Sequence, residues 1–190
     1  HWPDPETPYE ETLEAYKTLL ADGKIRAVGA SNLDATQLSD ALNVAAQYSL
    51  PAYQVLQPEY NLYDRSSFDG PLRDLCIKKN IGVVTYYSLA SGFLTGKYRK
   101  QDDLQQSKRG SGISKYLNPR GFKIVDALTS IAEEHNAKPA EVALAWLIAR
   151  EGVTAPIASA TSTSQVESFA KALQLSLTPQ QLSLLDTVSQ

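Results

Sequence analysis

The chain has 190 residues, a formal net charge of -3 at pH 7 and 43% hydrophobic residues, which is typical of a globular protein with a core. This charge gives no electrostatic support for binding nucleic acid or an anionic membrane, and no apolar run approaches the ~20 residues of a membrane span. The single cysteine, Cys76, permits no internal disulfide, and we expect it to be a buried helical residue. A reducing, cytoplasmic setting is the simplest assignment.

The first element in chain order is a loop that leads into a helix. The opening "HWPDPETPYEET" lacks the basic and apolar regions of a signal peptide. Thr7, Pro8 and Glu10 form the pattern of a capping box with proline in the first helical position, and apolar residues then recur at helical spacing through 9–20. The loop is typical of the exit from a preceding strand, so we expect the chain to be a portion of a larger domain.

Strands and helices alternate along the rest of the chain. Short β-rich runs predict strands at 25–31, 51–57, 81–87 and 153–159, and the almost wholly apolar run 81–87 indicates a strand buried on both faces. Apolar periodicity predicts the following helices: 34–48, 70–80, 121–136, 139–150, 161–173 and 179–188. Asp34 with Gln37, and Thr178 with Gln181, predict capping boxes. The polar stretch 98–116 predicts a long mobile loop.

Alternation at this spacing predicts parallel strands joined by right-handed crossovers. Two α/β architectures fit: a doubly wound open sheet, or the C-terminal half of a (β/α)8 TIM barrel, which needs ~250 residues when complete. In both, ligands bind at the carboxyl ends of the strands. Polar or aromatic groups stand at these ends: His1–Asp4, Ser31 and Asn32, Gln54 and Gln57, Tyr86 to Ser88, and "IASATSTSQ".

Each polar strand end also has a structural interpretation, because Ser, Asn and Thr commonly cap the following helix. The recurrence of such residues at five ends favours a ligand site. The two common phosphate loops, GxGxxG and GxxxxGK[ST], are absent from the sequence, as are CxxC and HExxH. We expect the second histidine, His135, to be a solvated residue near a helix end, and we expect no zinc site.

Several stretches together resemble one enzyme family. They are "HWPDP", "GKIRAVGASNL", "YQVLQPEYNLYDR", "IGVVTYYSLASGFLTGKY", "PAEVALAWLIAR" and "PIASATSTSQVE". In this order, over essentially the whole chain, they resemble the aldo-keto reductases, NADP-dependent (β/α)8-barrel oxidoreductases, and most closely the branch of bacterial enzymes and potassium-channel β-subunits. The resemblance implies that residues 1–190 are the C-terminal portion of one barrel domain, with its N-terminal strands and helices absent from the chain.

The resemblance also implies roles for individual residues. His1 matches the histidine of the family's catalytic Asp, Tyr, Lys and His tetrad, and no part of this chain corresponds to the other three. Tyr86 matches the aromatic residue that stacks on the nicotinamide. The other implied cofactor-binding residues are Ser31, Asn32 and Gln54 at the carboxamide, Leu89, Ser91, Gly92 and Lys97 at the pyrophosphate, and Thr161 and Gln165 at the adenosine phosphate, together with Tyr87, Ser88 and Ala90 in the same stretch as the pyrophosphate loop.

The sequence departs from this branch in the last strand exit and the following helix. Ser159 stands where the branch usually carries Gly, and Ser168 and Phe169 stand where it carries a Glu-Asn pair. No Arg or Lys occurs between Ser159 and Phe169, which weakens the clamp for a 2′-phosphate. Lys108 or Arg109 would substitute. The expected cofactor is NADP, with NAD as the alternative.

Three functions follow as hypotheses. The first is the reduction of aldehyde or ketone carbonyls to alcohols by hydride transfer in the full-length parent. The second is a non-catalytic cofactor-binding regulatory subunit of the same fold, and the third is an independent open-sheet domain of unrelated function. The expected partner is a small carbonyl substrate, and we expect no binding to nucleic acid or to a membrane. A homo-oligomer is compatible with the sequence. We expect an isolated 1–190 polypeptide to be inactive and to aggregate or dimerise through unpaired strand edges.

Overall fold

A computed structural model of the protein describes residues 1–106 and 112–190. These residues form two compact units, one of residues 1–59 and 66–84 and the other of residues 60–65 and 85–190. The division follows the chain closely, except that the short segment 60–65 belongs to the second unit. Each unit is built on its own contacts and is described separately.

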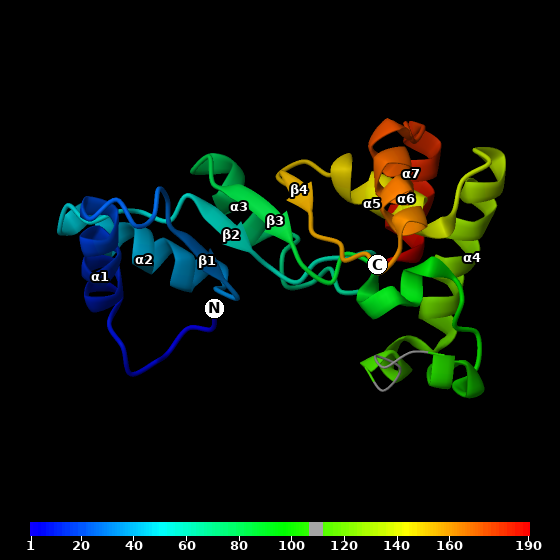
Figure 1. Ribbon diagram of the computed structural model, residues 1–190, viewed down its shortest axis with the longest axis horizontal. Coiled ribbons are helices and arrows are strands. Elements are labelled where there is room, and N and C mark those ends of the chain that lie inside the picture. The colour runs from blue at the N-terminus through cyan, green and yellow to red at the C-terminus, as the bar shows by residue number, and fades with distance from the viewer. Residues whose placement is uncertain (107–111) are drawn as a thin grey trace. The chain divides into compact units, whose positions relative to one another are not determined.

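The first unit is a parallel sheet in which β1 and β2 are each followed by a helix (Figure 1). The strands pair in register, with Gly29 opposite Val55 and Val55 opposite Gly82. The elements are α1 (Tyr9–Ala21), β1 (Gly29–Ser31), α2 (Ala35–Gln47), β2 (Val55–Gln57), α3 (Pro71–Lys78) and β3 (Gly82–Thr85). The helix α2 contacts both α1 and α3. Its buried residues, Leu38, Ala41 and Ala45, recur at the spacing of one helix face.

The strands are less buried than the sequence predicted. In β3, Val83 is fully buried whereas Val84 is only half-buried, so the expectation of two buried faces is wrong. Leu56 in β2 is likewise buried between half-buried neighbours. An apolar composition does not by itself show what covers each face. In a complete barrel, one strand face packs on helices and the other on the side chains that fill the interior, so both faces are covered.

Each strand is hydrogen-bonded beside the next one in the chain, in the order β1-β2-β3-β4. The strand β4 (Ala155–Pro156) follows Thr85, the last residue of β3: within the second unit, Ile157 N donates to Thr85 O over 2.8 Å. A doubly wound sheet reverses its strand order at a switch point, whereas a barrel adds its strands sequentially. The sequential order therefore favours the barrel interpretation.

The second unit is mainly helical. Among the described residues its elements include the 3-10 segments Ala90–Thr95, Gln101–Gln106 and Ser114–Tyr116, the strand β4, and the helices α4 (Pro119–Glu134), α5 (Pro139–Ile148), α6 (Thr163–Gln174) and α7 (Pro179–Val188). The helix α4 packs on α5 and α7, and α5 packs on α6 (Figure 1). Leu128 of α4 and Val142 of α5 are fully buried in this core, and Trp146 is 1% exposed.

The helix starts test the capping predictions. Asp34 with Gln37 and Thr178 with Gln181 form complete capping boxes, as expected. The prediction of a capping box at Thr7 is wrong, because α1 begins after Pro8 and has no side-chain cap. The Thr7 hydroxyl instead donates to Asp4 Oδ2 over 2.8 Å. The preceding loop thus forms its own turn and uses the group that the helix would need.

The segment 98–116 differs from the mobile loop that its polarity predicted. Its described parts contain 3-10 turns, and Tyr98 and Tyr116 are each 1% exposed. Tyr116 stacks on Phe93 with ring centroids 5.3 Å apart. Buried aromatic rings and the fully buried Ile113 thus anchor a segment whose other residues are mostly polar. The prediction for the rest of this segment lies outside the described residues.

Two single-residue expectations have different outcomes. Cys76 is buried in α3, as predicted. His135 ends α4 but is half-buried rather than solvated, with its Nε2 lying 3.1 Å from Gln181 Oε1. No helix among the described residues is long and apolar enough to cross a membrane.

Candidate active site

In the first unit, the end of β1 brings three predicted site residues together. Ser31 Oγ donates to Gln57 O over 2.7 Å, which ties the ends of β1 and β2. Asn32 has a left-handed backbone, with φ 58°, and its Nδ2 donates to the His1 carbonyl oxygen over 2.9 Å. The backbone of His1 is therefore held beside the β1 exit, while its side chain is exposed.

Gln54 directly precedes β2 (Val55–Gln57), so its expected place at the carboxyl end of that strand is wrong; the residue opposite Ser31 is Gln57. The backbone nitrogen of Gln54 donates to Val28 O and its carbonyl accepts from Gly82 N, each over 2.9 Å. The residue is thus fixed between two neighbouring strand segments, with an exposed side chain. At the β1 exit, by contrast, the hydroxyl oxygen of Ser31 and the side-chain amide of Asn32 have the acceptor and donor chemistry that a carboxamide group requires.

In the second unit, the segment 86–92, called the turn after β3 below, has an unusual backbone. Tyr87, Ala90 and Ser91 have φ values of 51°, 48° and 57°, and Gly92 follows with 99°. Left-handed geometry costs a non-glycine residue on the order of 1 kcal/mol, because Cβ crowds the backbone. The surrounding structure must therefore hold this turn, and such strain concentrates at functional sites.

Hydrogen bonds inside the turn hold part of this geometry. Ala90 N donates to Tyr87 O over 2.7 Å, and Ser88 Oγ donates to Thr85 O over 3.1 Å. Ser88 is 1% exposed and Ala90 is fully buried, so their side chains serve the packing of the turn, and a ligand contact there would use the backbone. Leu89, Ser91 and Gly92 are half-buried.

An aromatic pair and a cation accompany the turn. The rings of Tyr86 and Tyr87 meet edge to face with centroids 5.2 Å apart, and Tyr87 is 52% exposed. Lys97 is exposed, with its Nζ 4.9 Å from the centre of the Tyr98 ring. A nicotinamide dinucleotide needs a flat aromatic face, a cation near its pyrophosphate and amide partners for its carboxamide. Taken separately, the turn supplies the first two and the β1 exit the third, so the residues fit this cofactor chemically.

Thr161 and Gln165, predicted at the adenosine phosphate, are adjacent at the start of α6. Gln165 Oε1 accepts from Thr161 N over 2.6 Å, and both residues are exposed. Ser168, one of the departures from the family pattern, instead faces the core, where its Oγ donates to Glu141 Oε1 over 2.6 Å. Its substitution therefore changes an internal bond to α5. Lys108 and Arg109 lie outside the described residues.

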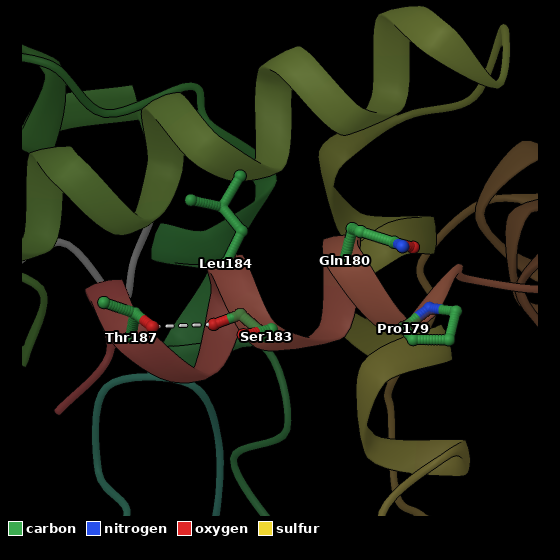
Figure 2. A pocket seen from close by; sticks show the side chains of 5 residues that line it. All are labelled: Pro179, Gln180, Ser183, Leu184 and Thr187. Atoms are coloured by element: carbon green, nitrogen blue, oxygen red, sulfur yellow. Dashed lines mark hydrogen bonds between the residues drawn. The ribbon is translucent and has the colours of Figure 1, made fainter.

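Two shallow surface hollows lie away from the strand ends. Figure 2 shows the one of about 450 Å³ on α7, with Leu184 and the hydrogen bond from Thr187 Oγ1 to Ser183 O. The other is lined by residues of α1 and by Pro8. Each hollow lies along a single helix, so neither has the convergent groups of an active site. Among the described residues there is also no cluster of His, Cys, Asp and Glu suited to a metal ion.

Comparison with known proteins identifies the family. The profile of the Aldo/keto reductase family matches residues 1–190. The chain belongs to the aldo-keto reductase family. A thermostable aldo-keto reductase crystallised with the inhibitor epalrestat matches 99% of the chain with a TM-score of 0.76 and 28% identity. The fold predicted from the sequence, part of an aldo-keto reductase barrel, is thereby confirmed.

The related proteins include both enzymes and proteins named as channel subunits. A probable voltage-gated potassium channel subunit beta from Oryza sativa is 33% identical over 199 residues, which cover 100% of this chain and 60% of the relative. L-glyceraldehyde 3-phosphate reductase from Escherichia coli O157:H7 is 28% identical over 193 residues, covering 98% of this chain and 56% of the relative. This aldo-keto reductase chain thus spans less than two thirds of the length of these relatives.

The segment 60–65 lies within "YQVLQPEYNLYDR", and its sequence predicted no role for it. In the structure, Tyr60 N donates to Tyr86 O over 3.3 Å, and Asn61 Nδ2 donates to Tyr87 O over 3.1 Å. These bonds join residues far apart in the chain, so no local spacing could have indicated them.

Proposed function

We propose that the full-length protein is an NADP-dependent oxidoreductase that reduces aldehyde or ketone carbonyls to alcohols by hydride transfer, with NAD as the alternative cofactor. The strained turn after β3 carries this proposal: its aromatic pair and left-handed residues precede the exposed Lys97 in a member of the aldo-keto reductase family. The buried thiol of Cys76 supports a reducing, cytoplasmic location.

The proposal includes the rest of the barrel. Residues 1–190 form its C-terminal portion, and the Asp, Tyr and Lys of the tetrad come from a portion that precedes them. The greater length of the related proteins supports this assignment, because the chain covers 60% of the rice relative and 57% of the crystallised reductase.

Each residue has a chemical role in the proposed reaction. Reduced nicotinamide, when bound, supplies the hydride. The His1 imidazole hydrogen-bonds the substrate carbonyl oxygen and stabilises the negative charge that develops there. The bond from Asn32 Nδ2 to the His1 carbonyl fixes the backbone from which this imidazole projects. Tyr86 offers an aromatic face to the nicotinamide, and the Lys97 ammonium offers a positive charge to the pyrophosphate.

The two histidines of the chain provide a matched experiment. In the full-length protein, His1→Ala should lower turnover of a model aldehyde about 100-fold, on the scale of acid–base residues, with little change in NADPH affinity. His135→Ala is the control, because this side chain bonds Gln181 at the end of α4. Turnover by steady-state oxidation of NADPH is the measurement. Unchanged turnover in His1→Ala would remove His1 from the reaction.

A second candidate is a cofactor-binding regulatory subunit that is not used as an enzyme. The observation that favours it is the name of the relatives from rice and Schizosaccharomyces pombe, both described as voltage-gated potassium channel subunit beta. The same assay separates the candidates. NADPH binding without turnover of any aldehyde or ketone in a panel supports the regulatory function, and turnover that depends on His1 supports the reductase.

A further inference from the structure

Asn61 is a fully buried amide in the segment 60–65 of the second unit. Its Oδ1 accepts from the backbone nitrogens of Tyr63 and Asp64, each over 2.8 Å. Its Nδ2 donates to Tyr87 O over 3.1 Å and to Asp64 Oδ2 over 3.3 Å. The side chain thus uses two donors and two acceptors, the full capacity of an amide. The Oδ1 atom holds the segment 60–65 in shape, and the Nδ2 atom reaches the turn after β3.

The Tyr87 carbonyl is the point at which these bonds meet. It accepts from both Asn61 Nδ2 and Ala90 N, while Tyr87 itself is held with φ 51°. The preceding carbonyl, of Tyr86, accepts from Tyr60 N. Two consecutive peptide groups of the strained turn are therefore bonded to the two consecutive residues Tyr60 and Asn61. A strained backbone persists only where its surroundings over-determine it, and these bonds do so.

We propose that Asn61 is a positioning residue: it fixes the left-handed backbone at Tyr87 and thereby the direction of the Tyr86 ring that receives the cofactor. The inference rests on the proposed function, in which Tyr86 stacks on the nicotinamide. Asn61 acts only through the turn, by holding one carbonyl oxygen in place. If an acceptor oxygen replaced Nδ2 at this position, it would repel the Tyr87 carbonyl oxygen, and the hydrogen bond that holds this carbonyl would be lost.

Asn61→Asp keeps the acceptor for the Tyr63 and Asp64 N–H groups and removes both bonds that Nδ2 donates, to Tyr87 O and to Asp64 Oδ2. Asp64→Asn removes the carboxylate that would face the new one, and combined with Asn61→Asp it separates the lost bond to Tyr87 from repulsion at Asp64. Asn118→Asp is the matched control. Asn118 Oδ1 caps α4 by accepting from Gly121 N over 3.0 Å, and its Nδ2 donates to Tyr63 Oη over 2.7 Å. The control thus changes the same atoms and also perturbs the contacts of Tyr63, yet it leaves the bond to Tyr87 in place.

Two measurements on the full-length protein test the inference. Hydrogen exchange of the Ala90 amide, which donates to Tyr87 O, should accelerate about tenfold in Asn61→Asp and stay unchanged in Asn118→Asp. NADPH affinity, followed by cofactor fluorescence, should weaken about five- to tenfold in Asn61→Asp only. If Asn61→Asp does not fold, Asn61→Ser replaces it, because its shorter hydroxyl still accepts from the local N–H groups but does not reach Tyr87.

The outcomes separate the inference from the function on which it rests. Exchange at Ala90 that is unchanged in Asn61→Asp, or equally faster in the control, overturns the positioning role. Faster exchange with unchanged NADPH affinity overturns the link between the turn and the cofactor. If the unmodified protein binds neither NADPH nor NADH, the proposed function fails, and the exchange result alone decides whether Asn61 holds the turn.

Discussion

The turn after β3 and the cluster around Asp186 lie in the same unit but use their polar groups in opposite ways. At the cluster, Asp186 Oδ1 accepts from Trp146 Nε1 over 3.1 Å and from Arg65 Nη1 over 3.2 Å, and Asp186 Oδ2 accepts from Arg150 Nη1 over 3.2 Å. These bonds connect α7, α5 and the segment 60–65. The turn has few such charged partners and instead holds several residues in left-handed conformations.

This difference separates stability from function. The charges of the Asp186 cluster are paired, and Trp146 and Asp186 lie within regular helices, so packing alone accounts for the cluster. The left-handed residues of the turn oppose ordinary backbone preference, so packing alone does not favour them. The regions are also connected, because Arg150 Nε donates to Tyr60 Oη over 2.9 Å and Tyr60 N donates to Tyr86 O. The stable cluster thus anchors the segment that holds the strained turn.

The largest expected effect on the free energy of unfolding comes from removing Asp186, the only carboxylate of the cluster among the described contacts. Asp186→Ala leaves Arg65 and Arg150, whose side chains are 13% and 17% exposed, without their shared partner. Breaking a buried pair costs about 3–5 kcal/mol, and the partial exposure of Asp186 reduces this to about 2–3 kcal/mol of unfolding free energy. Urea denaturation of the full-length protein measures the change.

Asp126→Ala is the control for this variant. Asp126 pairs with Arg99, but the two side chains are 66% and 43% exposed, so the expected loss is below about 0.5 kcal/mol. Equal losses in the two variants would contradict the role given to the Asp186 cluster.

A smaller effect of opposite sign is expected in the turn. Ser91 has φ 57°, so Ser91→Gly should remove backbone strain and raise the free energy of unfolding by about 0.5–1 kcal/mol, net of the flexibility that glycine adds to the unfolded chain. The matched change Ser183→Gly in α7 should lower it by about 0.5 kcal/mol. Thermal melting of both variants gives the comparison, and a loss in Ser91→Gly would show that the turn is not strained.

The smallest expected effect is a change of stability with pH, and it comes from two buried groups that stay uncharged, the Cys76 thiol and the Tyr53 hydroxyl. Burial raises the pKa of the Cys76 thiol from 9.0 to about 11, and burial together with the nearby Tyr16 and Tyr9 raises the pKa of Tyr53 from 10.0 to about 12. Because the folded state disfavours the thiolate, the Cys76 contribution is fully present well below pH 9.0, begins to fall as the pH approaches 9.0, and is lost as the pH rises through about 11.

Between about pH 8 and about pH 9, the Cys76 contribution to the free energy of unfolding should therefore fall by less than about 0.5 kcal/mol. Cys76→Ala should remove this part of the pH dependence, whatever its constant cost in packing. Denaturation of both proteins across this range is the measurement. A parallel pH dependence in the two proteins would argue against a raised thiol pKa.

Much of the local structure could be predicted from the sequence. The bounds of α7, the capping boxes of α2 and α7, and the burial of Cys76 all agree with the prediction. Strand length agreed less well: 153–159 was expected, but β4 comprises only Ala155–Pro156. Periodicity shows which residues are apolar, whereas strand length depends on where a neighbouring strand supplies hydrogen bonds.

By itself, the sequence determined the alternation of strands and helices, the chemistry at the strand ends and the resemblance to aldo-keto reductases, because each is a property of neighbours in the chain. Only the tertiary structure decided that Ser168 bonds Glu141 in the core and that Asn61 holds the Tyr87 carbonyl. The residues of these pairs are 27 and 26 positions apart. Such bonds form only when the fold brings distant segments together, and no local pattern encodes which partner will be met.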